Sequence, residues 1–196
     1  MIILDIETSG TNPWKHSILS IGAVDFLDLK RTFSRECQIR PGAHISEEGL
    51  AVNGFSREEI ADPRKETEEK IVADFFAWAM ESRDHTIAGQ NPSFDVSFLQ
   101  VASEEYGLNF PLAHRTFDLH SVCAAHMIKR GLNLPLENKR SALNSDSIME
   151  YVGLPAEPKP HIAFNGAKWE AEAFSRLFYN KPLFPEFKEY KIPWIS

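Results

Sequence analysis

Two acidic residues interrupt an apolar segment at the start of the chain. Residues 1–8 read MIILDIET, so Asp5 and Glu7 are separated by a single apolar residue. If the segment is a β-strand, side chains two positions apart point to the same face, and the two carboxylates lie side by side. Like charges at the end of a buried strand repel each other and are costly to desolvate. A bound cation would offset both costs, so the pair raises the hypothesis of a metal site.

Composition predicts one globular domain. The 196 residues are 43% hydrophobic and 25% charged, which is enough apolar material for a substantial core. We expect a domain over residues 1–180 and an extended, proline-containing tail over residues 181–196 that packs on it. No apolar run reaches the length of a bilayer span, and no secretory leader is expected before the first strand.

The cysteines and the net charge limit location and partners. Cys37 and Cys123 have neither metal-ligand nor disulfide-framework spacing, so we expect two buried thiols and a cytoplasmic protein. The net charge of −7 argues against a broad basic surface for nucleic acid. It remains compatible with an enzyme that holds only the end of a strand.

Hydrophobic periodicity and turn residues predict an α/β fold with a mixed sheet. The first three strands should form an antiparallel meander, and the later strands should run parallel and alternate with helices. We expect strands at residues 1–8, 18–26, 31–40, 86–90 and 115–117, and helices at 67–82, 93–106, 141–153 and 165–179, with a further helix directly after Asp118. Ser93 and Asp118 are expected to cap their helices, residues 58–63 to form a short helix or loop, and 131–139 to be a loop.

A third carboxylate follows a predicted strand. In GQNPSFD, Asn91 ends the strand and Asp95 lies in the first turn of the next helix. Asp95 could simply interact favourably with the helix macrodipole. Alternatively, it joins the first two acids, because strand-to-helix junctions are where α/β folds gather ligands. Phe94 is expected to pack inward and orient this turn.

A histidine precedes the last predicted helix. His161 follows a segment with three prolines, where an ordinary surface-loop histidine would be common. Beside a metal, however, its near-neutral pKa would suit abstraction of a proton from water.

Taken together, these motifs resemble one family. Asp5-x-Glu7, Asn91-x-x-Phe94-Asp95 and His161-x-Ala163 match, in order and spacing, the DEDD 3′→5′ exonucleases, in the subclass with a histidine. The resemblance runs to about residue 179 and implies a ribonuclease-H-like fold.

The resemblance also implies a metal-dependent activity. It implies two divalent ions, and oxygen ligands favour Mg²⁺ or Mn²⁺. Asp5 would be shared by both ions, Glu7 would hold one and reach the 3′-hydroxyl, and Asp95 would hold the other. His161 would deprotonate the attacking water. The expected activity is hydrolysis from the 3′ end of single-stranded RNA or DNA, with release of nucleoside monophosphates.

Substrate-binding residues are less sharply indicated. The backbone of Thr8, Ser9 and Gly10 would face the terminal nucleotide, and Asn91 would place the substrate or hold the turn. Trp14, His16 and Phe94 could stack on bases, although packing explains such aromatic residues equally simply. The basic pairs at 129–130 and 139–140 fit solvated surface better than phosphate contacts. RNA or DNA preference and oligomeric state, including a homo-oligomer, stay open.

The chain departs from the family at the fourth acid. The family has an aspartate five residues after the histidine, where this chain has Gly166. Glu170 could substitute, because it lies one turn further along the same helix face and its side chain leans back toward the N-terminus. Asn165 or water could instead complete the site. In the third alternative the protein is an impaired, nuclease-like module that binds nucleic-acid ends or a protein partner.

Overall fold

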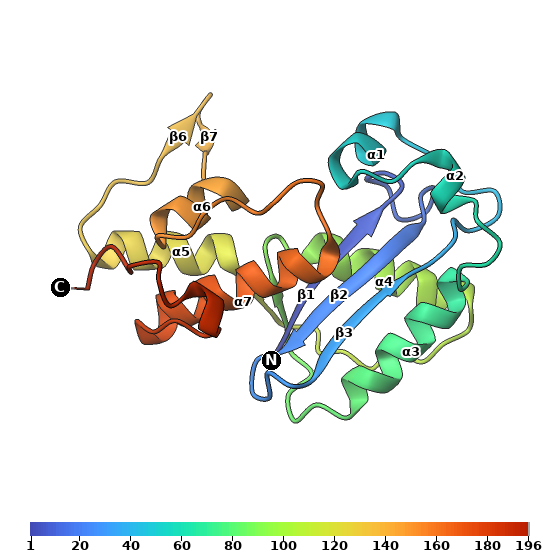
Figure 1. The fold of residues 1–196 in the computed structure, drawn as a ribbon, viewed down its shortest axis with the longest axis horizontal. Helices are drawn as coiled ribbons and strands as arrows, with labels where there is room; N and C mark the ends of the chain where they lie inside the picture. The colour runs from blue at the N-terminus through green and yellow to red at the C-terminus, as the bar shows by residue number, and fades with distance from the viewer. Residues whose placement is uncertain (196) are drawn as a thin grey trace.

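A five-stranded mixed sheet forms the centre of the molecule. The computed structural model describes residues 1–195, and its main sheet has the strand order β3-β2-β1-β4-β5, with helices on both faces (Figure 1). β1 pairs antiparallel with β2 and parallel with β4, β2 pairs antiparallel with β3, and β4 pairs parallel with β5. The strands are β1 (Ile2–Thr8), β2 (Ile18–Asp25), β3 (Thr32–Glu36), β4 (Ile87–Gly89) and β5 (Thr116–Asp118). The predicted fold class is therefore confirmed.

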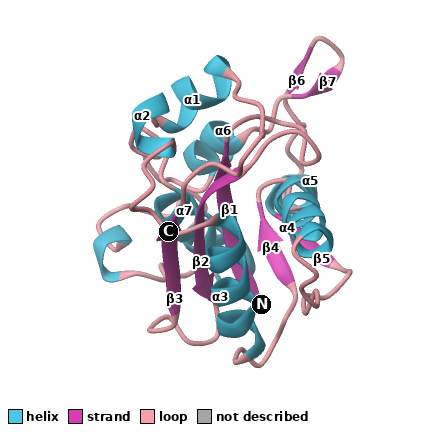
Figure 2. Cartoon of the chain, turned by 90° about the vertical axis from the view of Figure 1, so that its right-hand side faces the viewer, coloured by secondary structure: helices cyan, strands magenta, loops and turns pink. Residues whose placement is uncertain are grey.

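Seven α-helices and a small hairpin complete the described residues. The helices are α1 (Glu47–Asn53), α2 (Arg57–Ile60), α3 (Glu68–Met80), α4 (Ser93–Glu105), α5 (Leu119–Lys129), α6 (Ser145–Tyr151) and α7 (Ala163–Tyr179). A two-stranded hairpin of β6 (Leu136–Glu137) and β7 (Arg140–Ser141) stands away from the body (Figures 1 and 2). A 3₁₀ turn, η1 (Pro185–Phe187), lies in the C-terminal segment.

The central strand β1 separates two apolar cores. Ile2, Leu4 and Ile6 point into the core shared with α3 and α4, whereas Ile3 points into the core shared with α5, α6 and α7. This alternation follows from the two-residue period of a strand. Asp5 has the same parity as Ile3, so the acidic pair faces α7.

Several elements differ from the sequence-based expectations. The third strand ends at Glu36, and the helix predicted from residue 141 begins at Ser145, with Asn144 as its N-cap, because Asn144 accepts a hydrogen bond from the Ser147 backbone. The predicted loop 131–139 contains β6, and α1 was not predicted at all. Ser93 does not cap α4: the N-cap is Pro92 and makes no side-chain hydrogen bond. Asp118 caps α5 as expected, by accepting from the His120 backbone N–H.

The remaining general expectations concern thiols and membrane spans. Cys37 and Cys123 are buried and free, as predicted. None of the helices in residues 1–195 has the length and apolar character needed to cross a membrane.

A buried ion pair connects α7 to the C-terminal segment. Arg176 and Glu172 are fully buried, and the Arg176 Nε–H donates to Glu172 Oε1 at 2.7 Å. Arg176 also donates to the backbone oxygens of Val152 and Phe187, while Glu172 Oε2 accepts from two backbone N–H groups of the tail, those of residues 183 and 184. Every strong polar group of the pair therefore has a partner, which is the condition for burying charge.

We expect Arg176→Met to destabilise the protein strongly. Removing one partner leaves the Glu172 carboxylate charged and buried, which costs about 3–5 kcal/mol of unfolding free energy. Urea unfolding measures the effect. The control is Arg64→Met, since Arg64 is 88% exposed in its ion pair with Asp62 and its loss should change the unfolding free energy very little. Equal effects of the two substitutions would contradict this account of the tail.

Candidate active site

The acidic pair of β1 lies beneath the N-terminal part of α7. Asp5 is opposite Gly22 of β2, and Glu7 is opposite Ser20. A Cβ atom on Gly22 would overlap with the backbone at the start of α7, and a Cβ atom on Gly166 would overlap with Asp5 Oδ2. These two glycines let the helix backbone approach the sheet directly above Asp5. The helix therefore seals the face of β1 on which both carboxylates lie.

Asp95 reaches the same region from the other side of β1. Strand β4 ends at Gly89, so β1 continues beyond it without a strand neighbour on that side. The backbone N–H of Ile6 donates instead to Asp95 Oδ1, at 3.0 Å. The turn that starts α4 thus delivers a 3% exposed carboxylate beside the end of β1. The structure brings Asp95 close enough to Asp5 and Glu7 for their charges to interact.

Glu170 points from α7 into this acidic region. Its residue is 6% exposed, and its Oε2 atom is buried without a hydrogen-bond partner. A Cβ atom on Gly89 would lie 3.2 Å from that oxygen, so a glycine at the end of β4 also makes room for it. The charge of Glu170 raises the pKa of Asp5, and that of Asp95 raises the pKa of Glu170. Glu170 therefore belongs to the acidic cluster.

Glu157 is a fifth acid that the sequence reasoning missed. Its side chain is 8% exposed and lies 3.5 Å from the Nδ1 atom of His161, measured from Oε2. The His161 side chain is 30% exposed, so it stands at the border of the cluster. The available signal was an acid four residues before the histidine, within a segment that prolines mark as irregular.

Burial and mutual repulsion raise the pKa values of these acids. Desolvation is the largest cause for each of them. It raises the pKa of Glu7 to about 7, with the Glu157 charge as the second cause, and that of Asp95 to about 8, against hydrogen bonds that lower it. Asp5 keeps some accessible surface, yet protein surrounds its carboxylate and raises its pKa well above the ordinary value. Among residues 1–195, Lys and Arg form no ion pair with any of these five acids.

The donors suit hard divalent cations. The cluster offers only carboxylate oxygens and one imidazole, and the buried Oε1 of Glu157 and Oε2 of Glu170 have no partner. Within the described residues, no three Asp, Glu, His or Cys groups converge tightly enough to coordinate one ion. Carboxylates that repel one another are expected to stand apart without a cation. The residues therefore fit divalent ions in donor chemistry and in unsatisfied charge.

The loop after β1 is anchored from inside. Ser9 is fully buried, its hydroxyl donates to the His44 carbonyl, and it accepts the Ser17 backbone N–H. The Thr8 hydroxyl donates to the Gly10 carbonyl at 2.7 Å. These side chains are occupied by the protein, so any contact of the loop with a substrate would come from backbone groups. Gly10 is required here because a Cβ atom would overlap with the His16 ring.

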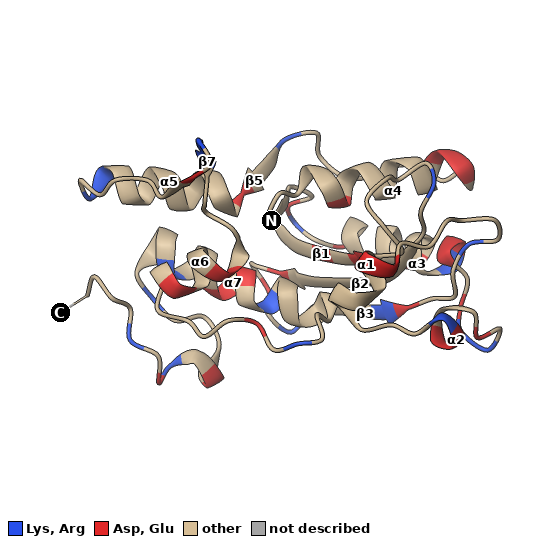
Figure 3. Ribbon diagram, turned by 90° about the horizontal axis from the view of Figure 1, so that it is seen from above, with Lys and Arg blue, Asp and Glu red and all other residues tan. Residues whose placement is uncertain are grey.

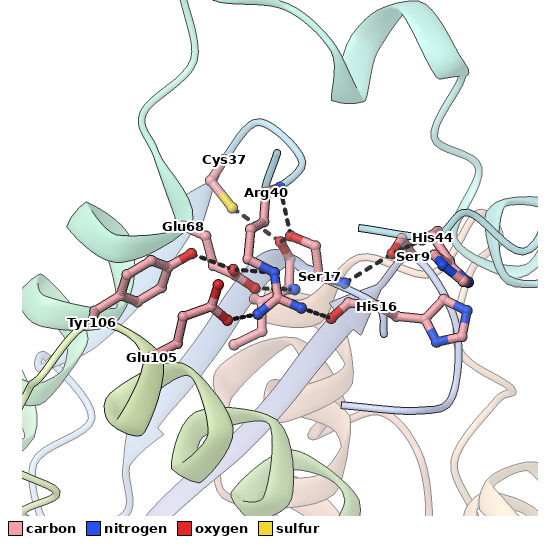
Figure 4. Close-up of polar contacts among 10 residues, drawn as sticks. Ser9, His16, Ser17, Cys37, Arg40, His44, Glu68, Glu105 and Tyr106 are labelled. Carbon is pink, nitrogen blue, oxygen red and sulfur yellow. Dashed lines mark hydrogen bonds and ion pairs between the residues drawn. The ribbon is translucent and has the colours of Figure 1, made fainter. Parts of the chain in front are cut away.

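Arg40 fixes the far end of the same loop. Figure 4 shows its guanidinium between Glu68 and Glu105, with one N–H group donating to the His16 carbonyl at 3.1 Å. Glu68 in turn accepts from the Ile18 backbone N–H and from the Tyr106 hydroxyl. This network connects α3 and α4 to the loop and holds it against the sheet. The signal for it in sequence is weak, because its members are far apart along the chain.

The other expected substrate residues lie in different surroundings. Asn91 adopts a left-handed conformation (φ 55°), and its carbonyl and side chain accept from Phe94 and Ser93, so it holds the turn. Phe94 is half-buried and packs on Phe98, with 5.0 Å between ring centroids. Trp14 is 68% exposed. Lys and Arg are scattered in short segments over the chain (Figure 3), so the ribbon shows no basic stripe.

The metal-free protein is expected to lose stability as pH rises. In the folded protein the pKa values of Glu7 and Asp95 are raised above their ordinary values of 4.5 and 3.8. The folded state therefore binds protons at these two carboxylates more tightly than the unfolded state does. Their stabilising contribution is therefore complete at low pH and is lost as pH rises toward their folded pKa values. A loss of several kcal/mol in unfolding free energy is expected between about pH 4 and pH 8, measured by urea unfolding in chelator.

Asp95→Asn should make this loss smaller, because the amide can still accept from Ile6 but does not ionise. Asp62→Asn is the control: Asp62 lies outside the acidic cluster, and hydrogen bonds from Arg64 lower its pKa to about 2. A slope for Asp95→Asn identical to that of the wild type would show that Asp95 is not the source of the pH dependence.

Two curated proteins are similar to this chain in sequence. A curated 3′-5′ DNA exonuclease, Cap18 of Escherichia coli, is 28% identical over 181 residues, with 88% of each chain covered. A PolC-type DNA polymerase III of Thermotoga petrophila is 25% identical over 177 residues, which are 90% of this chain but 12% of the polymerase. The chain thus spans only a small part of that polymerase.

Solved structures share the fold. The nuclease domain of 3′hExo, a DEDDh family member bound to rAMP, superimposes with a TM-score of 0.69 at 16% identity, covering 97% of this chain and 94% of the other. Escherichia coli exonuclease I in complex with a dA16 oligonucleotide gives a TM-score of 0.72 at 15% identity, covering 92% and 40%.

The sequence-based prediction of an exonuclease with a ribonuclease-H-like fold is confirmed by these matches and by a family model. That model, RNase_T, is described as Exonuclease and matches residues 2–174. Because the match spans nearly the whole chain, the protein belongs to this exonuclease family.

Proposed function

We propose that the protein is a divalent-metal-dependent 3′–5′ exonuclease that shortens single-stranded nucleic acid and releases nucleoside monophosphates. The observation that carries the proposal is the buried cluster of Asp5, Glu7, Asp95 and Glu170, whose charges have no cationic partner in the described residues. The name of the Escherichia coli relative, a 3′-5′ DNA exonuclease, supports the same direction of hydrolysis.

Each side chain has a role that its position allows. The charges of the other acids all raise the pKa of Asp5, so Asp5 would contact both ions, and Asp95 would hold one of them. Glu7, further along β1, would hold the other and reach the terminal 3′-hydroxyl. When bound, Mg²⁺ or Mn²⁺ ions would activate water and stabilise the leaving oxygen during attack on phosphorus. His161, at the solvent border of the cluster, would accept the proton of that water.

Glu170 is the best candidate for the fourth acid. Its carboxylate is already inside the cluster with a free oxygen, whereas Gly166 has no side chain and contacts Asp5 directly. The alternatives of Asn165 or water as the fourth ligand would leave Glu170 buried without a purpose. An inactive binding module likewise gains nothing from several buried carboxylates, because desolvating each of them costs stability.

The substrate is expected to be a short single-stranded end. The net charge is −7, so broad electrostatic attraction to a duplex is unfavourable. The backbone of residues 8–10, anchored by its own side chains, would contact the terminal nucleotide. Cys37 and Cys123 are free thiols, and we infer from them a cytoplasmic, reducing location.

The activity can be tested directly with end-labelled oligonucleotides. Single strands of DNA and RNA carrying a 5′ label should be shortened stepwise from the 3′ end with Mn²⁺ or Mg²⁺, and chelator should stop the reaction. A 3′-phosphorylated strand should resist, because Glu7 could no longer approach a free 3′-hydroxyl. Binding of the oligonucleotides without any shortening would contradict the proposal and favour a binding module.

Glu170→Gln should lower kcat by about 100-fold or more, because the amide keeps the shape but removes a negative ligand. It should also reduce the rise in melting temperature that Mn²⁺ causes in the absence of substrate. Asn165→Ala, five residues earlier on α7, is the matched control and should retain both activity and the Mn²⁺ effect. The reverse result would assign the fourth position to Asn165, and circular dichroism confirms that both variants fold.

A further inference from the structure

Glu157 is buried beside the acidic cluster without belonging to the expected set of ligands. Its side chain is 8% exposed, and its Oε1 atom has no hydrogen-bond partner. Its charge acts on Asp5 and on Glu7. Of the titratable groups that face it, Asp146 repels its carboxylate and the His161 ring attracts it. The imidazole is thus the favourable side-chain partner of this buried acid.

The segment between Glu157 and His161 is held at both ends. The Trp169 indole N–H donates to the Pro155 carbonyl at 3.2 Å, and Pro160 packs where Gly54 leaves room for it. The His161 backbone N–H donates to the Val52 carbonyl at 3.4 Å. The Glu157 carboxylate also faces the backbone N–H of the residue that precedes α7. The approach of Glu157 to the imidazole is therefore set by packing around the segment.

The orientation of the pair distinguishes the two ring nitrogens. Oε2 of Glu157 lies 3.5 Å from Nδ1 of His161, within ion-pair range. A carboxylate that accepts from one ring nitrogen fixes the tautomer and leaves the other nitrogen unprotonated. An imidazole that acts as a base needs such an unprotonated nitrogen toward the water.

We propose that Glu157 is a positioning residue that holds His161 with its proton on Nδ1, so that Nε2 is free to act as the base. This inference rests on the proposed function only in one respect, the role of Nε2 as the base that accepts a proton from water. The tautomer itself is a property of the metal-free protein and can be observed without any activity. A ligand role for Glu157 is the competing explanation, since its Oε1 atom is free.

The first test is the tautomer of His161 in metal-free, ¹⁵N-labelled protein. Long-range ¹H–¹⁵N correlation spectra separate protonated from unprotonated ring nitrogens, and comparison with His161→Ala identifies the signals among the seven histidines. In the wild type we expect a proton on Nδ1. Glu157→Ala should move the proton largely to Nε2, while Glu157→Gln should preserve the wild-type state, because its amide oxygen can still accept from Nδ1.

The second test is kinetic and uses the same variants with Mn²⁺ and a labelled single strand. Glu157→Ala should lower kcat by about 10–100-fold with little change in KM, and Glu157→Gln should recover most of the loss. Glu150→Ala, an exposed acid of α6, is the matched control and should resemble the wild type in both tests.

Two results would overturn the inference. An unchanged tautomer in Glu157→Ala would show that the carboxylate does not set the protonation of the ring. A failure of Glu157→Gln to recover activity, together with weaker Mn²⁺ stabilisation, would assign Glu157 to the ions. A wild type that does not shorten any strand would refute the proposed function, yet would leave the tautomer result standing.

Discussion

The close contact of α7 with β1 and β2 determines the rest of the site. It depends on two positions without side chains, Gly22 on the sheet and Gly166 on the helix, since a Cβ atom at either would overlap with its neighbour. That contact covers Asp5, brings Glu170 to the end of β4, and places the partly exposed His161 at the border of the acidic cluster. The packing of α7 on β1 and β2 therefore determines how deeply the acids are buried. Burial is in turn the largest cause of their raised pKa values.

Helix α7 carries two buried glutamates whose surroundings are opposite. Glu172 faces the C-terminal segment and accepts from Arg176 and from two backbone N–H groups. Glu170 faces the sheet, has one free oxygen and is surrounded by other acids. A buried carboxylate whose oxygens all accept hydrogen bonds and which is paired with a cation, such as Glu172, holds the fold together. A buried carboxylate that has an oxygen without a hydrogen-bond partner, such as Glu170, lowers the stability of the metal-free protein. Such residues are typical of functional sites.

The sequence predicted the parts of this molecule that depend on local periodicity. The acidic pair was visible because its spacing is that of a strand, and Asp95 because it follows a strand at a turn. The Arg40 network and the pairing of Glu157 with His161 depend on how distant or irregular segments pack, and no local pattern encodes them. Helix α1 and the β6–β7 hairpin were missed for a related reason: they are short elements whose residues are largely exposed, so hydrophobic periodicity is absent.

The absence of an aspartate at position 166 has a structural counterpart. That position is not an empty space, because Asp5 Oδ2 occupies the place where its side chain would begin. An acid there would force the helix away from β1. Moving the acid by four residues, about 6 Å along the helix, keeps it on the same face, and the longer glutamate side chain leans back toward the N-terminus. The close approach of the helix and the position of Glu170 are therefore compatible with each other, and under the proposed function Glu170 is the fourth carboxylate of the cluster.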